Sequence, residues 1–401
     1  MNNQLTTDLF QNRKTLFTSP ILKSLWKESS ELLMITSYPP RECGIATYSK
    51  DLIEALKTKF NQSFDIKVAA LETDHELHEY SKEVEYTLNT DKESDFNRLA
   101  QQINGKDQIK IVMIQHEFGF FKGKEELFLS FLNAVTKPIV LVFHTVLPTP
   151  NETWRQEVQR IASVAESIIV MTHISAEILN ADYRLQRDKI HVIPHGTHLV
   201  KHLDKSFLKE KHQFSGKKIL STFGLLSSGK SLETTLDALP AIIQSNPDVL
   251  FLIIGKTHPS VVKHEGEEYR QFLMHKIEEL QIEKHVRFIN RFVPLNELLE
   301  FLQLTDIYLF TSKDPNQAVS GTFSYALSCG CPIISTPIPH ANEVLENNGE
   351  NIIDFGNSVQ LANKVNQLFA SPDKMRSMII NGLENGSNFL GEFSHSACIV
   401  V

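Results

Sequence analysis

Short apolar runs recur along the chain, and most are followed by a stretch whose apolar residues return at helical spacing. Runs of about four to eight apolar residues bounded by turn residues are typical of strands buried on both faces of a parallel sheet. The runs that we predict as strands are residues 32–36, 64–70, 109–114, 138–143, 167–171, 190–193, 218–223, 249–254, 286–290, 306–310, 333–335 and 352–354. Strand and helix patterns that alternate in this way predict an α/β protein with two doubly wound layers.

Hydrophobic periodicity fades and charge rises over residues 199–217, between the two blocks of strands and helices. A chain of 401 residues is long enough for two domains that each bury a core. We therefore predict an N-terminal domain over residues 1–198 with a lead-in over residues 1–30, a linker over residues 199–217, and a C-terminal domain over residues 218–401. We expect residues 72–95, which are charged and irregular, to form loops.

The charged residues nearly balance, with 40 Lys and Arg against 48 Asp and Glu and a net charge of −8. The chain therefore has no overall basic field to hold nucleic acid or an anionic membrane, and any phosphate must be bound by a local site. The four cysteines are too few and too scattered for a disulfide scaffold, and the pair Cys329 and Cys331 lacks the spacing of a zinc site. We expect reduced thiols in a cytoplasmic protein.

The two ends of the chain carry weaker signals. The first thirty residues mix apolar with charged side chains, which is typical of neither a signal peptide nor a membrane span. An amphipathic helix there could pack on the protein or rest on a membrane surface, so a peripheral membrane contact stays open. The last four residues, from Cys398 to Val401, have the form of a prenylation box, which we attribute to chance because no polybasic stretch precedes it.

Histidines follow four of the predicted strands at their carboxyl ends. They are His116, His144, His173 and His195. Ligands of open parallel sheets bind at this edge, so four such histidines favour a polar cleft there. Each of them alone is more often a helix cap or a hydrogen-bonded structural residue. His75 and His78 are spaced like a helical metal pair, but no further ligand pattern follows, and we expect a solvated loop there.

Residues 314–345 combine a polar loop, a small-residue turn at Ser320, Gly321 and Thr322, a short apolar helix and a buried strand. The free amides and the positive dipole end of a helix start form a natural anion site, especially where glycine lets a ligand approach the backbone. Phosphate is the obvious candidate. An ordinary helix–strand unit of a doubly wound sheet would show the same pattern.

This segment resembles the donor-binding segment of the retaining GT-B glycosyltransferases of family 4, the glycosyl transferases group 1. In that family a Glu-x7-Glu motif precedes an Ala-x-Gly-x-Pro-Val-Ile pattern. The turn at residues 320–322 and the strand at residues 333–336 fit it well, whereas Gln317 and Tyr325 stand where the two glutamates are expected. The Ser-Gly-Thr-x-x-Tyr-Ala version resembles a mannosyltransferase-like branch.

Four other segments resemble motifs of the same family in the same order. Gly44 corresponds to the glycine at the first helix start, which faces the donor diphosphate and the acceptor. His116, within Gln-His-Glu, corresponds to the histidine that contacts the donor sugar. Gly224 and Lys230 fit the Gly-x-Leu-x-x-x-Lys-Gly loop, whose lysine binds the donor diphosphate. Arg291 begins a segment that is similar to the nucleotide-base loop of the family.

The resemblance implies a GT-B protein with two Rossmann-like domains and a cleft between them. It implies transfer of a hexosyl group, with mannosyl favoured, and with retention of configuration. The donor would be a nucleotide-diphosphate sugar, either GDP-mannose or a UDP-hexose, and the acceptor a carbohydrate or glycolipid. Neither a metal nor another cofactor is needed if Lys230 and the turn at residues 320–322 neutralise the leaving diphosphate.

Departures from the family pattern keep other functions open. Both motif carboxylates are absent, Ser231 replaces the usual glycine after Lys230, and only six residues follow His395, where family members end in a long helix. A non-catalytic GT-B module that binds sugar nucleotides is one alternative, and a nucleotide-sugar epimerase of the same fold is another. A glycosyl phosphorylase is disfavoured because no pyridoxal-phosphate lysine region is recognisable.

Overall fold

The structure is a computed structural model that describes residues 30–60, 63–196, 200–345 and 350–383. The lead-in over the first 29 residues, the short tail and the prenylation-like end lie outside the described residues. The Cα atoms cluster into two compact units, one containing residues up to 143 together with 156–168, and the other containing residues 144–155 and those from 169 onward. The domain limits inferred from the sequence stay a prediction.

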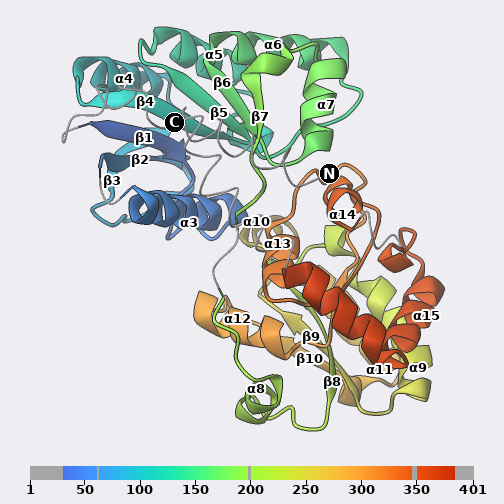
Figure 1. The fold of residues 1–401 in the computed structure, drawn as a ribbon. Helices are drawn as coiled ribbons and strands as arrows, with labels where there is room; N and C mark the ends of the chain where they lie inside the picture. The colour runs from blue at the N-terminus through green and yellow to red at the C-terminus, as the bar shows by residue number, and fades with distance from the viewer. Residues whose placement is uncertain (1–29, 61–62, 197–199, 346–349, 384–401) are drawn as a thin grey trace, which may run out of the picture. The chain divides into compact units, whose positions relative to one another are not determined.

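The first sheet has seven strands in the order β3-β2-β1-β4-β5-β6-β7 (Figure 1). The strands are β1 Glu31–Thr36, β2 Asp65–Glu72, β3 Val84–Asn89, β4 Ile109–His116, β5 Ile139–Phe143, β6 Ser167–Val170 and β7 Ile190–Val192. β1 is an interior strand of the sheet and pairs in parallel with β2 and with β4. All six residues of β1 are buried, as the continuous apolar run predicts for a central parallel strand.

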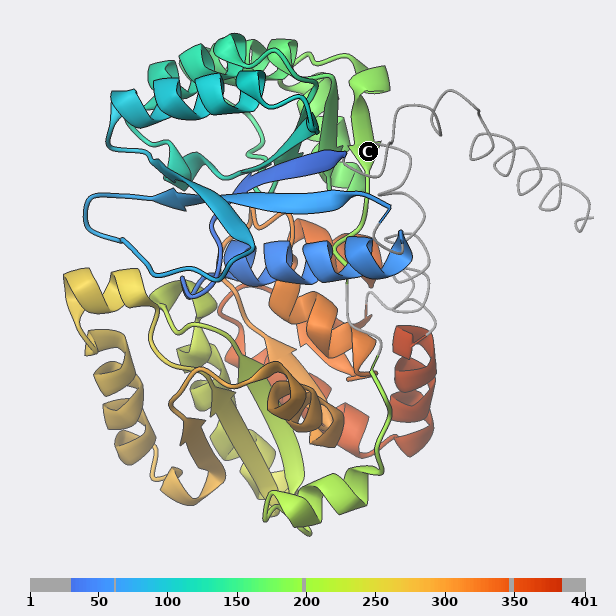
Figure 2. The same ribbon diagram turned by 90° about the vertical axis from the view of Figure 1, so that its left-hand side faces the viewer.

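Helices cover the first sheet. They are α3 Gly44–Lys59, α4 Glu93–Gly105, α5 Glu125–Ala134, α6 Glu152–Val164 and α7 His173–Ala181, with short 3₁₀ turns at Phe118–Phe120 and Arg187–Lys189. α4, α5 and α6 lie along one face and α3 along the other (Figure 2). The strand ends that carry His116, His144, His173 and His195 belong to four neighbouring strands, β4 to β7.

The second sheet has five strands in the order β10-β9-β8-β11-β12. The strands are β8 Lys218–Phe223, β9 Val249–Ile254, β10 Val286–Ile289, β11 Ile307–Phe310 and β12 Ile333–Ser335. The helical elements are α8 Lys205–Lys211, η3 Ser228–Lys230, α9 Leu232–Ser245, α10 Pro259–Glu265, α11 Glu268–Glu279, η4 Glu283–His285, α12 Leu295–Leu304, α13 Gly321–Ser328, α14 Pro339–Val344 and α15 Ser358–Phe369. Adjacent strands pair in parallel throughout this sheet.

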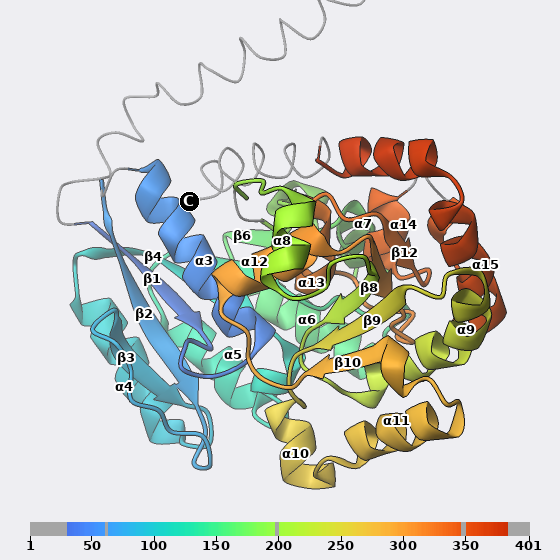
Figure 3. The same cartoon turned by 90° about the horizontal axis from the view of Figure 1, so that it is seen from below.

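Two apolar cores cover the two faces of the second sheet. Alternate residues of β9 enter different cores, with Leu252 in one and Phe251 and Ile253 in the other. The first core contains residues of α12 and α13, and the second contains residues of α9, α11 and α15. Figure 3 shows these two groups of helices on opposite sides of β8, β9 and β10. The continuous apolar runs in the sequence reflect this double burial.

Three segments differ from the sequence-based expectation. Residues 72–95 are not irregular throughout, because they contain β3 and the start of α4. β3 is an edge strand that carries polar and charged residues, so its pattern lacks the apolar run of a central strand. Residues 199–217 contain helix α8, whose Leu208 is fully buried in the core. Residues 352–354 form no strand but a single bridge between Ile352 and Ser335.

None of the helices in the described parts of the chain is both long enough and apolar enough to cross a membrane.

Candidate functional site

The backbone amides of the turn that starts α13 are only partly paired within the described parts of the chain. Ser320 is the N-cap, and its Oγ accepts from the Phe323 amide at 3.3 Å. The Ser320 amide itself donates to His340 Nδ1 at 3.0 Å. The amides of Gly321 and Thr322 have no acceptor among the residues that the structure describes. Two open donors therefore remain at the positive end of α13, as expected for an anion site.

Lys230 and Thr322, a residue of this turn, both lie close to Gly224. Gly224, which follows β8, has φ +129°, and a Cβ built on it would lie 3.1 Å from Lys230 Nζ and 3.2 Å from Thr322 Cγ2. A side chain at position 224 would therefore crowd Lys230 and Thr322, and it would be strained at this φ. Gly224, Lys230 and Thr322 were each selected from the sequence, and the structure brings them together.

The backbone of the Lys230 loop is held by neighbouring segments. The Lys230 carbonyl accepts from Thr311 Oγ1 at 2.9 Å, and the Lys313 amide donates to the Gly229 carbonyl at 3.0 Å. Ser231 has φ +50°, a left-handed conformation that favours the glycine usual in the family. Its Oγ is hydrogen-bonded with Thr234 Oγ1 at 3.0 Å, which helps to offset the strain. The backbone of the residue that carries the ammonium group, Lys230, is thus held in place.

The electrostatics of the Lys230 ammonium are unusual for this protein. Burial lowers the pKa of Lys230 from 10.5 to about 8. Lys209, by comparison, lies 2.6 Å from the Asp306 carboxylate. No carboxylate in the described ranges forms an ion pair with Lys230. A desolvated and unpaired cation next to open amides favours binding of a polyanion such as a diphosphate.

The same loop also has the spacing Gly-x4-Gly-Lys-Ser of a nucleoside-triphosphate P-loop, from Gly224 to Ser231. A P-loop cradles phosphate with its own backbone amides. Here the amides of Gly224, Leu226, Lys230 and Ser231 donate to the carbonyls of Ile254, Lys256, Ser227 and Ser228, respectively. These four amides are therefore used within the protein and cannot cradle a phosphate.

Gln317 and Tyr325 occupy different surroundings. Gln317 Oε1 accepts from Ser312 Oγ at 2.8 Å, so this oxygen is used within the loop. Tyr325 is 8% exposed, and its ring lies 6.1 Å from that of Phe223, edge to face. Tyr325 thus packs in the core beneath α13. The roles that the family pattern assigns to the two positions stay predictions.

Arg291 follows β10, which is separated from β8 by β9 in the sheet. Its guanidinium forms an ion pair with Glu297, and about half of the side chain is exposed. The structure therefore does not place Arg291 against the Lys230 ammonium. A role at the nucleotide base stays a prediction from the resemblance.

His116 lies at the end of β4 and is 2% exposed. Its ring packs among aromatic rings, with centroids 4.7 Å from Phe143, 5.1 Å from Phe118 and 5.7 Å from Phe128. Nδ1 is buried without a hydrogen-bond partner among the described groups, and burial lowers the pKa of His116 to about 3. The imidazole is therefore neutral at physiological pH.

Gly44 is the first residue of α3, and a Cβ there would meet no atom within 4 Å.

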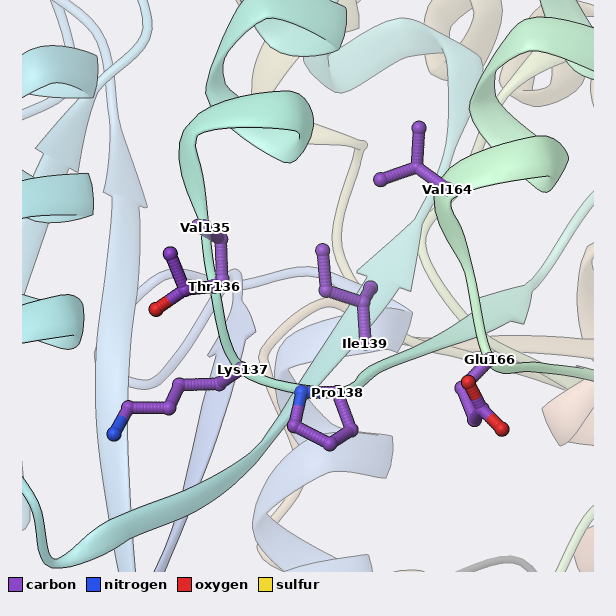
Figure 4. A pocket seen from close by; sticks show the side chains of 7 residues that line it. All are labelled: Val135, Thr136, Lys137, Pro138, Ile139, Val164 and Glu166. Carbon is purple, nitrogen blue, oxygen red and sulfur yellow. The ribbon is translucent and has the colours of Figure 1, made fainter.

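A cavity of about 300 Å³ lies elsewhere, at the amino end of β5 (Figure 4). Residues 135–139, Val164 and Glu166 line it. In Figure 4 the Lys137 and Glu166 side chains point in different directions and do not converge on a common point. Because the predicted sites lie at the carboxyl ends of strands, this cavity is separate from them.

Two family models match the chain side by side. The model described as Glycosyltransferase Family 4 matches residues 43–201, and the model described as Glycosyl transferases group 1 matches residues 204–385. The chain belongs to this glycosyltransferase family. Spore coat protein SA of Bacillus subtilis is 32% identical over 161 residues, which are 40% of this chain and 41% of that protein. The chain thus matches less than half the length of this relative.

Similar solved structures show that this chain has the GT-B fold. HepE from Anabaena in complex with UDP has a TM-score of 0.70 at 16% identity, over 92% of this chain and 98% of HepE. A glycosyltransferase from Rickettsia africae has a TM-score of 0.70 at 16% identity, over 92% and 97%. A UDP-forming α,α-trehalose-phosphate synthase from Burkholderia xenovorans has a TM-score of 0.65 at 13% identity, over 92% and 98%. The predicted family and fold are confirmed, and the mannosyltransferase-like branch stays a prediction.

Sequence reasoning missed one residue that contacts the turn at the start of α13 and undervalued another. His340, in α14, accepts the Ser320 amide and was not selected. His195 was noted only as one of four strand-end histidines, yet a Cβ at Gly321 would lie 3.2 Å from its Nε2, a contact within the second unit. A signal for His340 was present, because it follows β12 as the other histidines follow β4 to β7.

Proposed function

We propose that this glycosyltransferase transfers a hexosyl group, with mannosyl favoured, from a nucleotide-diphosphate sugar to a carbohydrate or glycolipid acceptor, with retention of configuration. The observation that carries the proposal is the unpaired Lys230 ammonium beside the open amides of Gly321 and Thr322. The structural neighbour HepE binds UDP and UDP-glucose, which supports a nucleotide sugar as the donor. Either GDP-mannose or a UDP-hexose would supply the diphosphate.

In the proposed mechanism, negative charge develops on the diphosphate as its bond to the sugar breaks. Lys230 and the two amides stabilise this charge without a metal ion. The acceptor hydroxyl attacks on the face that the diphosphate leaves, and a phosphate oxygen takes its proton. No protein nucleophile is required, which is compatible with glutamine rather than glutamate at position 317.

A non-catalytic module that binds sugar nucleotides is the second candidate. It is favoured by the absence of both motif carboxylates at Gln317 and Tyr325 and by the sealed position of His116. Both candidates share the diphosphate site, so donor binding alone does not separate them. An epimerase of the same fold would convert the donor sugar without any acceptor.

Calorimetry with UDP, GDP and ADP sugars identifies the donor first. Radiolabelled donor is then incubated with the protein, and release of nucleoside diphosphate is measured with and without carbohydrate acceptors. Release supports the transferase, binding without any release supports the module, and a changed sugar on intact donor supports the epimerase. The NMR coupling constant at the new anomeric carbon tests retention, and addition of EDTA tests independence from metal.

A further inference from the structure

His340 is tied to the backbone of the α13 turn by a single directed hydrogen bond. Its Nδ1 accepts from the Ser320 amide at 3.0 Å, and its ring lies 5.0 Å from that of Phe323. A ring nitrogen that accepts a hydrogen bond carries no proton, so the proton of this imidazole is on Nε2. His340 is only 5% exposed. Burial, with a smaller effect from His195, lowers the pKa of His340 to about 3, so the neutral acceptor persists at physiological pH.

This hydrogen bond helps decide which amides of the turn remain open. The Ser320 amide is taken by His340, while the Phe323 and Ser324 amides are taken by the Oγ and carbonyl of Ser320. The Gly321 and Thr322 amides lie between these satisfied donors. A rotation of the Ser320 peptide would change the direction in which both open amides point.

The segment that carries His340 is itself fixed to the sheet. Thr336, directly after β12, donates from Oγ1 to the Ser312 carbonyl at 2.6 Å, and its amide donates to the Phe310 carbonyl at 2.9 Å. The Ile338 amide donates to the Thr336 carbonyl at 2.8 Å. The segment that carries the Nδ1 acceptor is therefore held both by the end of β11 and by Ser312, in the loop that precedes α13.

We propose that His340 is a positioning residue for donor binding: its Nδ1 orients the Ser320 peptide so that the Gly321 and Thr322 amides face the donor diphosphate. This inference rests on the proposed function, because it assumes that a diphosphate binds at the turn. His340 itself contacts no part of the donor in this arrangement. A plain packing role beside Phe323 is the competing explanation.

Two substitutions at the same position separate these explanations. In His340→Asn, the Oδ1 atom can reach the position of Nδ1 and accept from Ser320. In His340→Gln, the polar atoms extend toward the position of Nε2, so the acceptor at Nδ1 is lost. Both variants remove the imidazole from Phe323 and lose similar packing. His285→Gln is a control outside the turn, since His285 is a partly buried histidine whose Nδ1 is bonded to the Val249 carbonyl.

The measurements are calorimetric affinities for UDP and GDP, together with the Tm of each variant. We expect His340→Gln to weaken binding of the preferred nucleotide about tenfold, the size of one well-formed hydrogen bond. His340→Asn should stay within about threefold of the wild type. His285→Gln should lower the Tm without a change in affinity. Equal losses of affinity in the two His340 variants, or no loss in either, would overturn the positioning role.

Hydrogen exchange of the Ser320 amide tests the contact without any nucleotide. We expect slow exchange in the wild type and in His340→Asn, and exchange about tenfold faster in His340→Gln. If the wild type binds neither UDP nor GDP, the proposed function is refuted. The exchange rates still show in that case whether His340 orients the Ser320 peptide. Exchange at equal rates in all three proteins would refute the inference directly.

Discussion

Lys230 lies in the loop after β8 and His116 is the last residue of β4, but the neighbours of these two residues differ. Lys230 lies against Gly224 and near the open amides of α13, whereas His116 is enclosed by aromatic rings and its Nδ1 has no hydrogen-bond partner among the described residues. Desolvation lowers both pKa values, so a shifted pKa by itself does not identify a binding group. Open donors near the charge favour Lys230 as the candidate binding group. Without such donors, His116 has the surroundings of a core residue.

The largest expected effect concerns the charge of Lys230. Lys230→Ala should weaken binding of the nucleoside diphosphate by about 2–4 kcal/mol, because the phosphate charge then lacks its cation. Isothermal titration calorimetry measures this loss. Lys218→Ala is a matched control at the opposite end of the same strand, where the ammonium donates to Asn246 Oδ1 at 2.8 Å. Unchanged affinity in Lys230→Ala would show that Lys230 does not bind the diphosphate, and the difference in role between Lys230 and His116 would then be refuted.

The next effect tests whether His116 is more than a core residue. His116→Ala should lower the free energy of unfolding by about 2–3 kcal/mol, because it leaves a cavity among the aromatic rings. His116→Phe should keep the stability, since phenylalanine fills the same space and removes the unpartnered nitrogen. If His116 acts on the donor sugar, both variants lose transfer rate and keep nucleoside diphosphate affinity. A His116→Phe protein that transfers sugar at the wild-type rate would show that the ring only packs.

The pH dependence of nucleoside diphosphate binding tests whether the charge of Lys230 contributes to it. Since burial lowers its pKa to about 8, the ammonium of the free protein loses its proton as the pH rises through that value. Nucleoside diphosphate affinity should therefore be constant from about pH 7 to 8, where the phosphates are fully ionised, and fall by up to about tenfold per unit above it. Lys230→Arg stays charged and should show no such fall. A wild-type affinity that is flat to pH 10 would contradict a neutralising role for this ammonium.

The smallest effects concern the two positions where the family carries glutamates. Tyr325→Phe should cost about 0.5–1.5 kcal/mol of donor affinity, the size of one neutral hydrogen bond. Gln317→Ala should reduce the transfer rate, because a neutral amide at that position would hold sugar hydroxyls. Competition binding and initial rates measure the two effects. If both variants bind and transfer as the wild type does, the alignment of this loop with the Glu-x7-Glu motif is wrong.

Local sequence patterns were enough to predict most of the elements and the loops that follow them. Apolar runs predicted all but one of the strands in the described parts of the chain, because burial on both faces leaves a continuous local pattern. Gly224, Lys230 and the turn at residues 320–322 could be selected because their motifs are local in sequence. β3 escaped prediction because an edge strand needs no continuous apolar run.

The surroundings of each of these residues depend on the fold and could not be predicted from local patterns. His116 looked like a polar residue at a strand end, and only the packing of Phe118, Phe128 and Phe143 around it shows that it is sealed. The hydrogen bond between the Ser320 amide and His340 joins residues 20 positions apart, and the residues next to either of them in the sequence do not predict it. Such pairs depend on how β11 and β12 align and on where the following loops turn back. A local pattern records which face of an element is buried, but not which side chain of another element will meet it.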